Sequence, residues 1–175
     1  NNNNIETGMI WGNQWDRTLM WLMECNAENP ETGKTKEEVI SDSTSWGNYS
    51  NATFTYTNSS GVTATKNENS STRIPTGSTE YTKANNIYDL AGNVYDWTME
   101  ARSTDRRVSR GGGCNVYGTS YPARIRYNVY PYNSDNIVRL QGCTVRQVKI
   151  ASVTCDTSNF HNQGSWNGLC CKVKS

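Results

Sequence analysis

Two stretches of the sequence decide the fold prediction, IYDLAGNVYDWT at residues 87–98 and RVSRGGG at residues 107–113. Gly92-Asn93 is a turn signal between apolar residues, and the run 94–98 has the aromatic and β-branched character of a short strand. The three consecutive glycines at 111–113 permit a positive φ or the close approach of another backbone. These stretches therefore predict a tight turn, a strand, and a glycine-rich crossing close behind them.

The composition around these stretches is that of a loop-rich domain. The chain has 175 residues, 17 Lys plus Arg and 16 Asp plus Glu, so its formal net charge of +1 provides no attraction for nucleic acid. Only 34% of residues are hydrophobic, but 6 Trp and 10 Tyr argue against disorder. Uncharged polar residues suit turns and short strands, and the alternating run Phe54–Thr57 predicts one strand. We predict an α+β fold with short antiparallel strands, and no stretch of about 18 apolar residues that would insert into a membrane.

The sequence before these stretches predicts two helices. Asn13 is expected to cap a helix over Gln14–Glu24, with Asp16 in its first turn. Its apolar residues recur at near-helical spacing, namely Trp11, Trp15, Leu19 and Leu22. A shorter helix is predicted after Thr35, because Thr35 and Glu38 have the spacing of a capping box.

The two motifs, in this order and at this spacing, resemble the signature of the formylglycine-generating-enzyme branch of the C-type lectin fold. The resemblance covers roughly Met9–Leu140 and is greatest to the variable proteins of diversity-generating retroelements in bacteria and their phages. Proteins of this group display a hypervariable patch on the fold and bind ligands with it. The resemblance implies a C-type lectin-like domain over residues 1–140 and a set of scaffold positions, which are Trp15, Gly92, Asn93, Trp97, Arg110, Gly111, Gly112 and Arg126.

Both ends of the chain depart from the family pattern. Family domains begin with a strand and a first helix, and we expect this portion to be missing before Met9. Residues 141–175 do not resemble the usual family ending, so we treat them as an atypical Cys-rich segment. A zinc site there is disfavoured because the candidate ligands lack a CxxC knuckle. Those candidates are Cys155, His161, Cys170 and Cys171.

Oxidase chemistry of the generating-enzyme kind is also disfavoured. Those enzymes use two cysteines that bind copper, and their pattern places the catalytic positions at Val116 and Tyr121 of this chain. Neither side chain can provide a thiolate or a soft copper ligand. We therefore predict that the protein is not an enzyme and uses no metal or cofactor. An oxidase or its degenerate relative, and a carbohydrate-binding module, remain the alternatives.

The segment Cys114–Ile137 holds five of the 10 tyrosines among Asn, Ser and Gly, a composition typical of antibody binding loops. Composition alone gives equal weight to a Tyr-rich strand pair that packs on its own core. The family resemblance favours binding, because retroelement variable positions are Asn codons framed by Arg-Gly-Gly, Pro and Arg. It implies a variable region at 113–137 with these ligand-contacting positions: Cys114, Val116, Tyr117, Tyr121, Ile125, Tyr127, Val129, Tyr130, Tyr132 and Asp135. We interpret the exposed Val and Ile of this set as sampled contact residues.

The function expected from the resemblance is recognition of a protein or glycan ligand on a cell or virion surface. A rigid scaffold would hold exchangeable side chains, with Tyr117, Tyr127 and Tyr130 as aromatic anchors and multivalent display adding to affinity. We expect no nucleic-acid partner and no membrane insertion. The expected location is extracellular, on a bacterial surface or in a phage receptor-binding structure.

Overall fold

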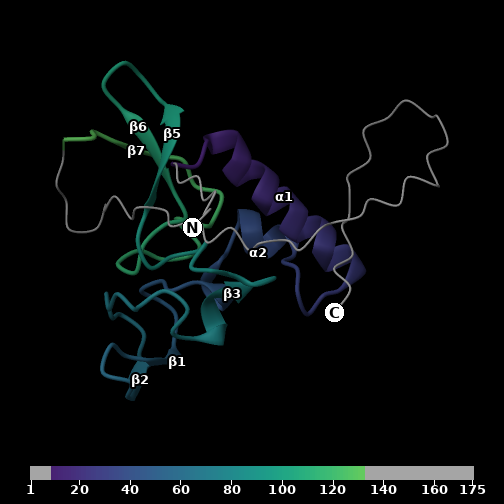
Figure 1. The fold of residues 1–175 in the computed structure, drawn as a ribbon, viewed down its shortest axis with the longest axis vertical. Helices are drawn as coiled ribbons and strands as arrows, with labels where there is room; N and C mark the ends of the chain where they lie inside the picture. Colours follow the sequence, from purple (N-terminus) through teal and green to yellow (C-terminus); the bar gives the residue numbers. More distant parts are fainter. Residues whose placement is uncertain (1–8, 133–175) are drawn as a thin grey trace, which may run out of the picture. The chain divides into compact units, whose positions relative to one another are not determined.

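The computed structural model describes residues 9–132, which all lie within one compact unit of the chain, Thr7–Thr144. This part is an α+β structure in which long loops connect short elements (Figure 1). The helices are α1 (Gly12–Glu28), α2 (Lys36–Ile40), and the 3-10 turns η1 (Thr44–Trp46) and η2 (Glu80–Thr82). The strands are β1 (Phe54–Thr57), β2 (Thr63–Lys66), β3 (Lys83–Ala84), β4 (Ile87–Tyr88), β5 (Asp96–Ala101), β6 (Arg107–Arg110) and β7 (Tyr127–Val129). The expectations for the region before Met9, for Asp135 and for the segment 141–175 lie outside the described residues.

Helix α1 confirms the first predicted helix but begins and ends differently. Its N-cap is Trp11, whose extended backbone precedes the helix and whose N–H donates to Gln14 Oε1 at 2.8 Å. The prediction that Asn13 caps the helix is therefore wrong, and Asp16 lies beyond the first turn. The predicted apolar face is buried except for Trp11, which is 54% exposed. No helix within residues 9–132 is long and apolar enough to span a membrane.

The short predicted elements are confirmed where local rules define them. Thr35 caps α2, its Oγ1 accepts from the Glu38 N–H at 3.2 Å, and Glu38 Oε2 accepts from the Thr35 N–H at 2.8 Å. The predicted strand Phe54–Thr57 is β1, which pairs with β2 in an antiparallel hairpin. Strand β5 begins at Asp96, two residues later than predicted, because its pairing with β6 begins there, opposite Arg110. Val94 and Tyr95 are buried in the segment that precedes it.

The three-stranded antiparallel sheet, in the order β5-β6-β7, joins both sequence motifs to the Tyr-rich segment (Figure 1). Asp96 is opposite Arg110 and Trp97 is opposite Ser109, so the scaffold position Trp97 lies on β5. Ser109 is in turn opposite Tyr127, the first residue of β7. The sheet therefore holds one end of the Tyr-rich segment in a fixed register with the motif strands.

The main core lies against the buried face of α1. Besides Trp15, Leu19 and Leu22 of α1 it contains Val39, Trp46, Tyr49, Ala84, Leu90, Ala91 and Ala123. Two of its aromatic residues also make buried hydrogen bonds to distant backbone. Trp15 Nε1 donates to the Ala123 carbonyl at 3.0 Å, and Tyr49 Oη donates to the Gly111 carbonyl at 2.7 Å. The core thus fixes the backbone at both ends of the stretch 111–123, which carries four of the ten predicted variable positions.

Candidate ligand-binding surface

The Gly92-Asn93 turn is a buried junction between three segments. Both residues have a positive φ, 72° and 63°, and a Cβ on Gly92 would lie 2.4 Å from the Asn48 carbonyl oxygen. Asn93 Oδ1 accepts from the Ile74 N–H and from Asn48 Nδ2, each at 3.1 Å, while Asn93 Nδ2 donates to the Ile74 carbonyl at 3.0 Å. The Asn93 carbonyl accepts from the Cys114 N–H at 3.0 Å. The Asn93 side chain therefore satisfies the backbone N–H and carbonyl of Ile74, while the Asn93 carbonyl holds the backbone of Cys114.

The glycine-rich crossing has the two properties predicted for it. Gly111 and Gly112 have φ values of 83° and 78°, in the left-handed region that favours glycine. A Cβ on Gly112 would lie 2.5 Å from the Tyr121 carbonyl oxygen and 2.7 Å from the Tyr49 ring. The backbone of the Tyr-rich segment therefore passes directly over Gly112, where no side chain fits.

Four charged residues from four parts of the chain form what we call the charge cluster, namely Asp16, Glu100, Arg110 and Arg126. Arg110 is fully buried, and its Nη atoms lie 2.5 Å from Asp16 Oδ1 and 3.9 Å from Glu100 Oε2. Arg126 pairs with the same acids, with its Nε 3.0 Å from Glu100 Oε1 and its Nη2 on Asp16 Oδ2. Two cations thus face two anions, and the cluster ties α1, β5 and β6 to the residue just before β7. The sequence had indicated both arginines as scaffold positions but not their acidic partners.

The tyrosine segment, which we define as residues 113–132, contains no helix or strand before β7 but is firmly anchored. Its backbone is tethered to residues 43–51 by four hydrogen bonds. Ser50 N–H donates to the Val116 carbonyl at 2.8 Å and Ser43 N–H donates to the Gly118 carbonyl at 3.3 Å. Gly118 N–H donates to Asn51 Oδ1 at 3.1 Å, and Ala123 N–H donates to Ser43 Oγ at 2.9 Å. The main chain is therefore fixed where irregular structure would otherwise allow several conformations.

Five tyrosines of this segment form what we call the tyrosine surface, namely Tyr117, Tyr121, Tyr127, Tyr130 and Tyr132. Tyr117, Tyr127 and Tyr132 are 49%, 42% and 75% exposed, and the other two are half-buried. The structure therefore leaves all five predicted tyrosine positions with some access to solvent.

The tyrosine surface is supported by contacts with Tyr95 and Arg106 that the sequence did not indicate. Buried Tyr95 lies under Tyr127 and Tyr121, with ring centroids 5.4 and 6.2 Å away. Tyr130 stacks on Tyr132 at 5.1 Å, and the guanidinium of Arg106 lies 4.2 Å from the Tyr130 ring centroid. Arg106 also donates a hydrogen bond to Tyr130 Oη. These contacts orient exposed rings without covering them.

Three residues that were predicted to contact the ligand are instead buried or packed against the core. Cys114 is buried and its Sγ donates to the Ser71 carbonyl at 3.2 Å, while burial raises the pKa of the thiol. Val129 is buried at the end of β7, although Tyr127 and Asn128 before it are exposed. Val116 is half-buried and packs against the main core. The interpretation of the Val positions as sampled contact residues is corrected here, because both side chains contribute to folding.

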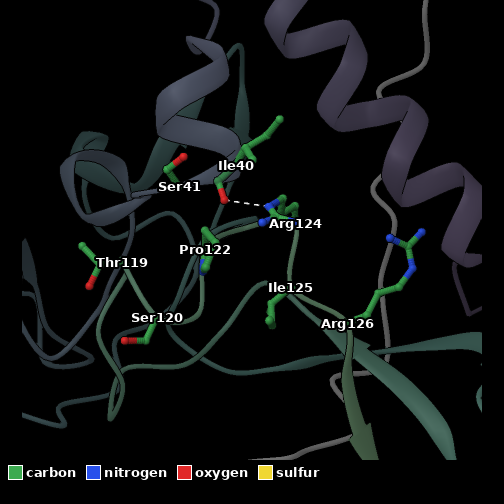
Figure 2. A pocket seen from close by; sticks show the side chains of 8 residues that line it. All are labelled: Ile40, Ser41, Thr119, Ser120, Pro122, Arg124, Ile125 and Arg126. Atoms are coloured by element: carbon green, nitrogen blue, oxygen red, sulfur yellow. Dashed lines mark hydrogen bonds between the residues drawn. The ribbon is translucent and has the colours of Figure 1, made fainter.

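A pocket of about 460 Å³ opens beside the tyrosine segment, where residues 119–126 pass the end of α2 (Figure 2). Its lining combines apolar, hydroxyl and guanidinium groups, from Ile40, Ser41, Thr119, Ser120, Pro122, Arg124, Ile125 and Arg126. Arg124 Nε donates to the Ile40 carbonyl at 2.7 Å, which holds the side chain against α2. The sequence indicates Ile125 as a variable position and Pro122 and Arg126 as frame residues. It does not indicate Arg124, because the contact with Ile40 joins residues 84 positions apart.

Two acidic residues beside the Gly92-Asn93 turn have raised pKa values. Burial raises the pKa of Asp89, and burial together with the charge of Asp89 raises the pKa of Asp96 to about 7. Within residues 9–132 no group of three or more His, Cys, Asp or Glu side chains is arranged as a metal site. The candidate zinc ligands of the C-terminal segment lie outside the described residues.

Comparisons with models of protein families, with curated proteins and with solved structures give no match for this chain. Its function is therefore argued from the surface itself.

Proposed function

We propose that this protein is a ligand-binding display domain whose tyrosine surface is diversified by a retroelement. The proposal includes a C-type lectin-like fold of the formylglycine-generating type, and display on a bacterial surface or in a phage receptor-binding structure. The observation that carries it is the combination of exposed tyrosines with a tethered main chain. Tyrosine supplies a large amphipathic contact area at low entropic cost, and a fixed backbone spares the cost of ordering a loop on binding.

The arrangement separates residues that hold the segment from residues that face solvent. Gly112, Ala123 and Cys114 are buried and contact other parts of the fold, whereas Tyr117 and Tyr132 project from it. A substitution at an exposed position changes the surface chemistry without disturbing a buried partner. This separation is what a diversified binding domain needs, since many sequences must share one fold.

The positions that correspond to oxidase cysteines support binding over catalysis. Val116 packs against the core and Tyr121 lies edge-on to Tyr95 and Tyr127, with interplanar angles of 90° and 73°. Neither offers a nucleophile or a soft metal ligand. Cys114, the nearest thiol in sequence, is buried on a backbone carbonyl.

Amplicon sequencing of this gene across its source population tests the proposal. We expect substitutions concentrated at adenine-bearing codons between 113 and 137, with free exchange at Tyr117, Tyr127 and Tyr132. Positions 114 and 129 should vary only among small or apolar residues, because both side chains are buried. Variation spread evenly along the chain, with 113–137 as constant as 87–98, would contradict diversification.

A glycan array tests the alternative that the protein is a carbohydrate-binding module. The array is probed with the full chain displayed as a streptavidin tetramer. Sugar rings stack on aromatic faces, and the Tyr130 and Tyr132 rings are the most suitable pair. Binding to neutral glycans that is lost in Tyr132→Ala would identify a carbohydrate-binding module with a fixed site. We expect the unmutated chain to bind none of the neutral glycans on the array.

A further inference from the structure

We infer that the pocket between α2 and the tyrosine segment binds a carboxylate of an acidic peptide segment in the protein's ligand. The inference rests on the proposed function, since Ile125 both lines the pocket and is a proposed variable position. It adds a chemical class of ligand, which the tyrosine surface alone does not define.

The charge of the pocket comes from Arg124. Arg126 also lines it, but its guanidinium extends toward α1 and pairs with Asp16 and Glu100 in the charge cluster (Figure 2). Arg124 forms no ion pair with any residue between 9 and 132, and its side chain is exposed. The two acids of the charge cluster are balanced by Arg110 and Arg126, so they leave the charge of Arg124 uncompensated. The pocket is therefore a cationic site that an anion would complete.

The geometry of Arg124 favours a carboxylate. Its Nε is held by the Ile40 carbonyl at 2.7 Å, which fixes the plane of the guanidinium and leaves the edge with both Nη atoms for a ligand. Two parallel N–H donors match the two oxygens of a carboxylate. A phosphate group usually requires more than one cation or a row of backbone N–H groups. One uncompensated guanidinium is therefore better matched to a single negative charge.

The remaining lining favours a peptide as the carrier of that carboxylate. Hydroxyl groups of Ser41, Thr119 and Ser120 supply further donors around the pocket. Ile40, Pro122 and Ile125 supply apolar surface between them, and Figure 2 shows Pro122 and Ile125 between Ser120 and Arg126. An Asp or Glu beside an aliphatic residue would place its carboxylate on Arg124 and its neighbour on this apolar surface. An acidic sugar would set hydroxyl groups against the same carbon atoms, which is less favourable.

The test uses the full chain as a streptavidin tetramer and two matched random peptide libraries. In one library a central position is Glu, in the other it is Gln, and both carry the same flanking diversity. We expect the Glu library to be enriched, and the selected peptides to bind Arg124→Gln at least about tenfold more weakly. Arg124→Lys should recover part of the affinity, because it keeps the charge but loses the two-pronged geometry. Arg102→Gln, in the exposed β5–β6 turn, makes the same change in net charge and should bind normally.

A second variant keeps the test decisive if Arg124→Gln does not fold. Ser120→Asp places a negative charge on the exposed rim of the pocket without removing the Arg124 contact with α2, and should also abolish the preference for Glu. Equal enrichment of both libraries, or a Glu preference that survives in Arg124→Gln and Ser120→Asp, would overturn the carboxylate site.

The same design separates this inference from the proposed function. Peptides whose binding depends on Tyr117 and Tyr127 but not on Glu or Arg124 would leave the display domain in place and remove the acidic ligand. Binding of sialylated or uronic-acid glycans through Arg124, with no enriched peptides, would overturn the peptide assignment. Failure of every library and glycan to bind the tetramer would count against both proposals.

Discussion

The charge cluster and the tyrosine surface both include residues of the three-stranded sheet, Glu100 and Arg110 in the first and Tyr127 in the second, but their contacts with the rest of the fold differ. Arg110 is fully buried and contacts acids from two other elements, whereas Tyr132 is 75% exposed and its one ring contact is with Tyr130. Each residue of the cluster is defined by several partners that are distant in sequence. Each exposed tyrosine has one or two side-chain contacts with residues in the described part of the chain. The comparison shows that the residues that hold this fold together are different from the residues whose side chains can be exchanged without disturbing it.

The largest expected effect is at the centre of the charge cluster. Arg110→Met leaves Asp16 and Glu100 without their buried partner, and we expect a loss of about 3–5 kcal/mol in the free energy of unfolding. Arg107→Met is the matched control on the same strand, because Arg107 donates only to backbone carbonyls in the described part of the chain. It should cost less than about 1 kcal/mol. Urea unfolding followed by circular dichroism measures both, and equal losses would remove the special role of the cluster.

The next effect is at the Gly92-Asn93 turn. Asn93→Ala removes three buried hydrogen bonds and leaves groups of Asn48 and Ile74 unpaired, for an expected loss of about 2–4 kcal/mol. Asn86→Ala controls for backbone strain, because exposed Asn86 has nearly the same positive φ, 65° against 63°. Its expected cost is about 1 kcal/mol. Similar melting temperatures for the two variants would show that the buried hydrogen bonds contribute little.

Stability should also depend on pH through Asp96. Its pKa is about 7 in the folded protein, above the value of about 3.9 for an unfolded chain, so its contribution to stability is present at low pH and lost as the pH rises through about 7. Between pH 5 and pH 8, in buffer with EDTA, the wild type should lose about 5 °C of melting temperature relative to Asp96→Asn. Asp105→Asn, in the exposed turn after β5, should behave as wild type. Parallel curves for wild type and Asp96→Asn would contradict the raised pKa.

The smallest effects are expected on the tyrosine surface itself. Tyr117→Ala should change the free energy of unfolding by less than about 0.5 kcal/mol, since its hydroxyl makes only a 3.5 Å contact with Asn69. Tyr127→Ala should cost about 1 kcal/mol, because it also removes ring contacts with Tyr95 and Tyr121. Thermal melts of the two variants measure the difference. A loss above about 3 kcal/mol at Tyr117 would indicate a core strand pair instead of a binding surface.

Local rules predicted the elements whose cause lies within a few residues. The Thr35 and Glu38 capping box, the strand Phe54–Thr57 and the positive φ of Gly111 and Gly112 all follow from their own neighbourhood. The same local reasoning placed the start of α1 wrongly, because the backbone of Trp11 takes the N-cap position.

Contacts between distant residues escaped prediction, and most of the candidate site depends on them. Asp16 looked like a first-turn acid but pairs with Arg110 and Arg126, which are 94 and 110 positions away. The contacts of Cys114 with Ser71 and of Arg124 with Ile40 also join distant residues, which are 43 and 84 positions apart. The spacing of residues along the chain holds no signal for such partners. The sequence therefore indicates the tyrosines but not the residues that hold their rings, such as Tyr95 and Arg106.

The four hydrogen bonds between residues 43–51 and the tyrosine segment remove conformational freedom from that segment during folding, before any ligand arrives. Fixing one residue of free backbone costs about 1–2 kcal/mol at room temperature. A segment that is already fixed does not incur that cost again in the complex. Titration calorimetry should therefore show association with little unfavourable entropy from loop ordering, and its heat-capacity change should report mainly the apolar ring area that the ligand covers.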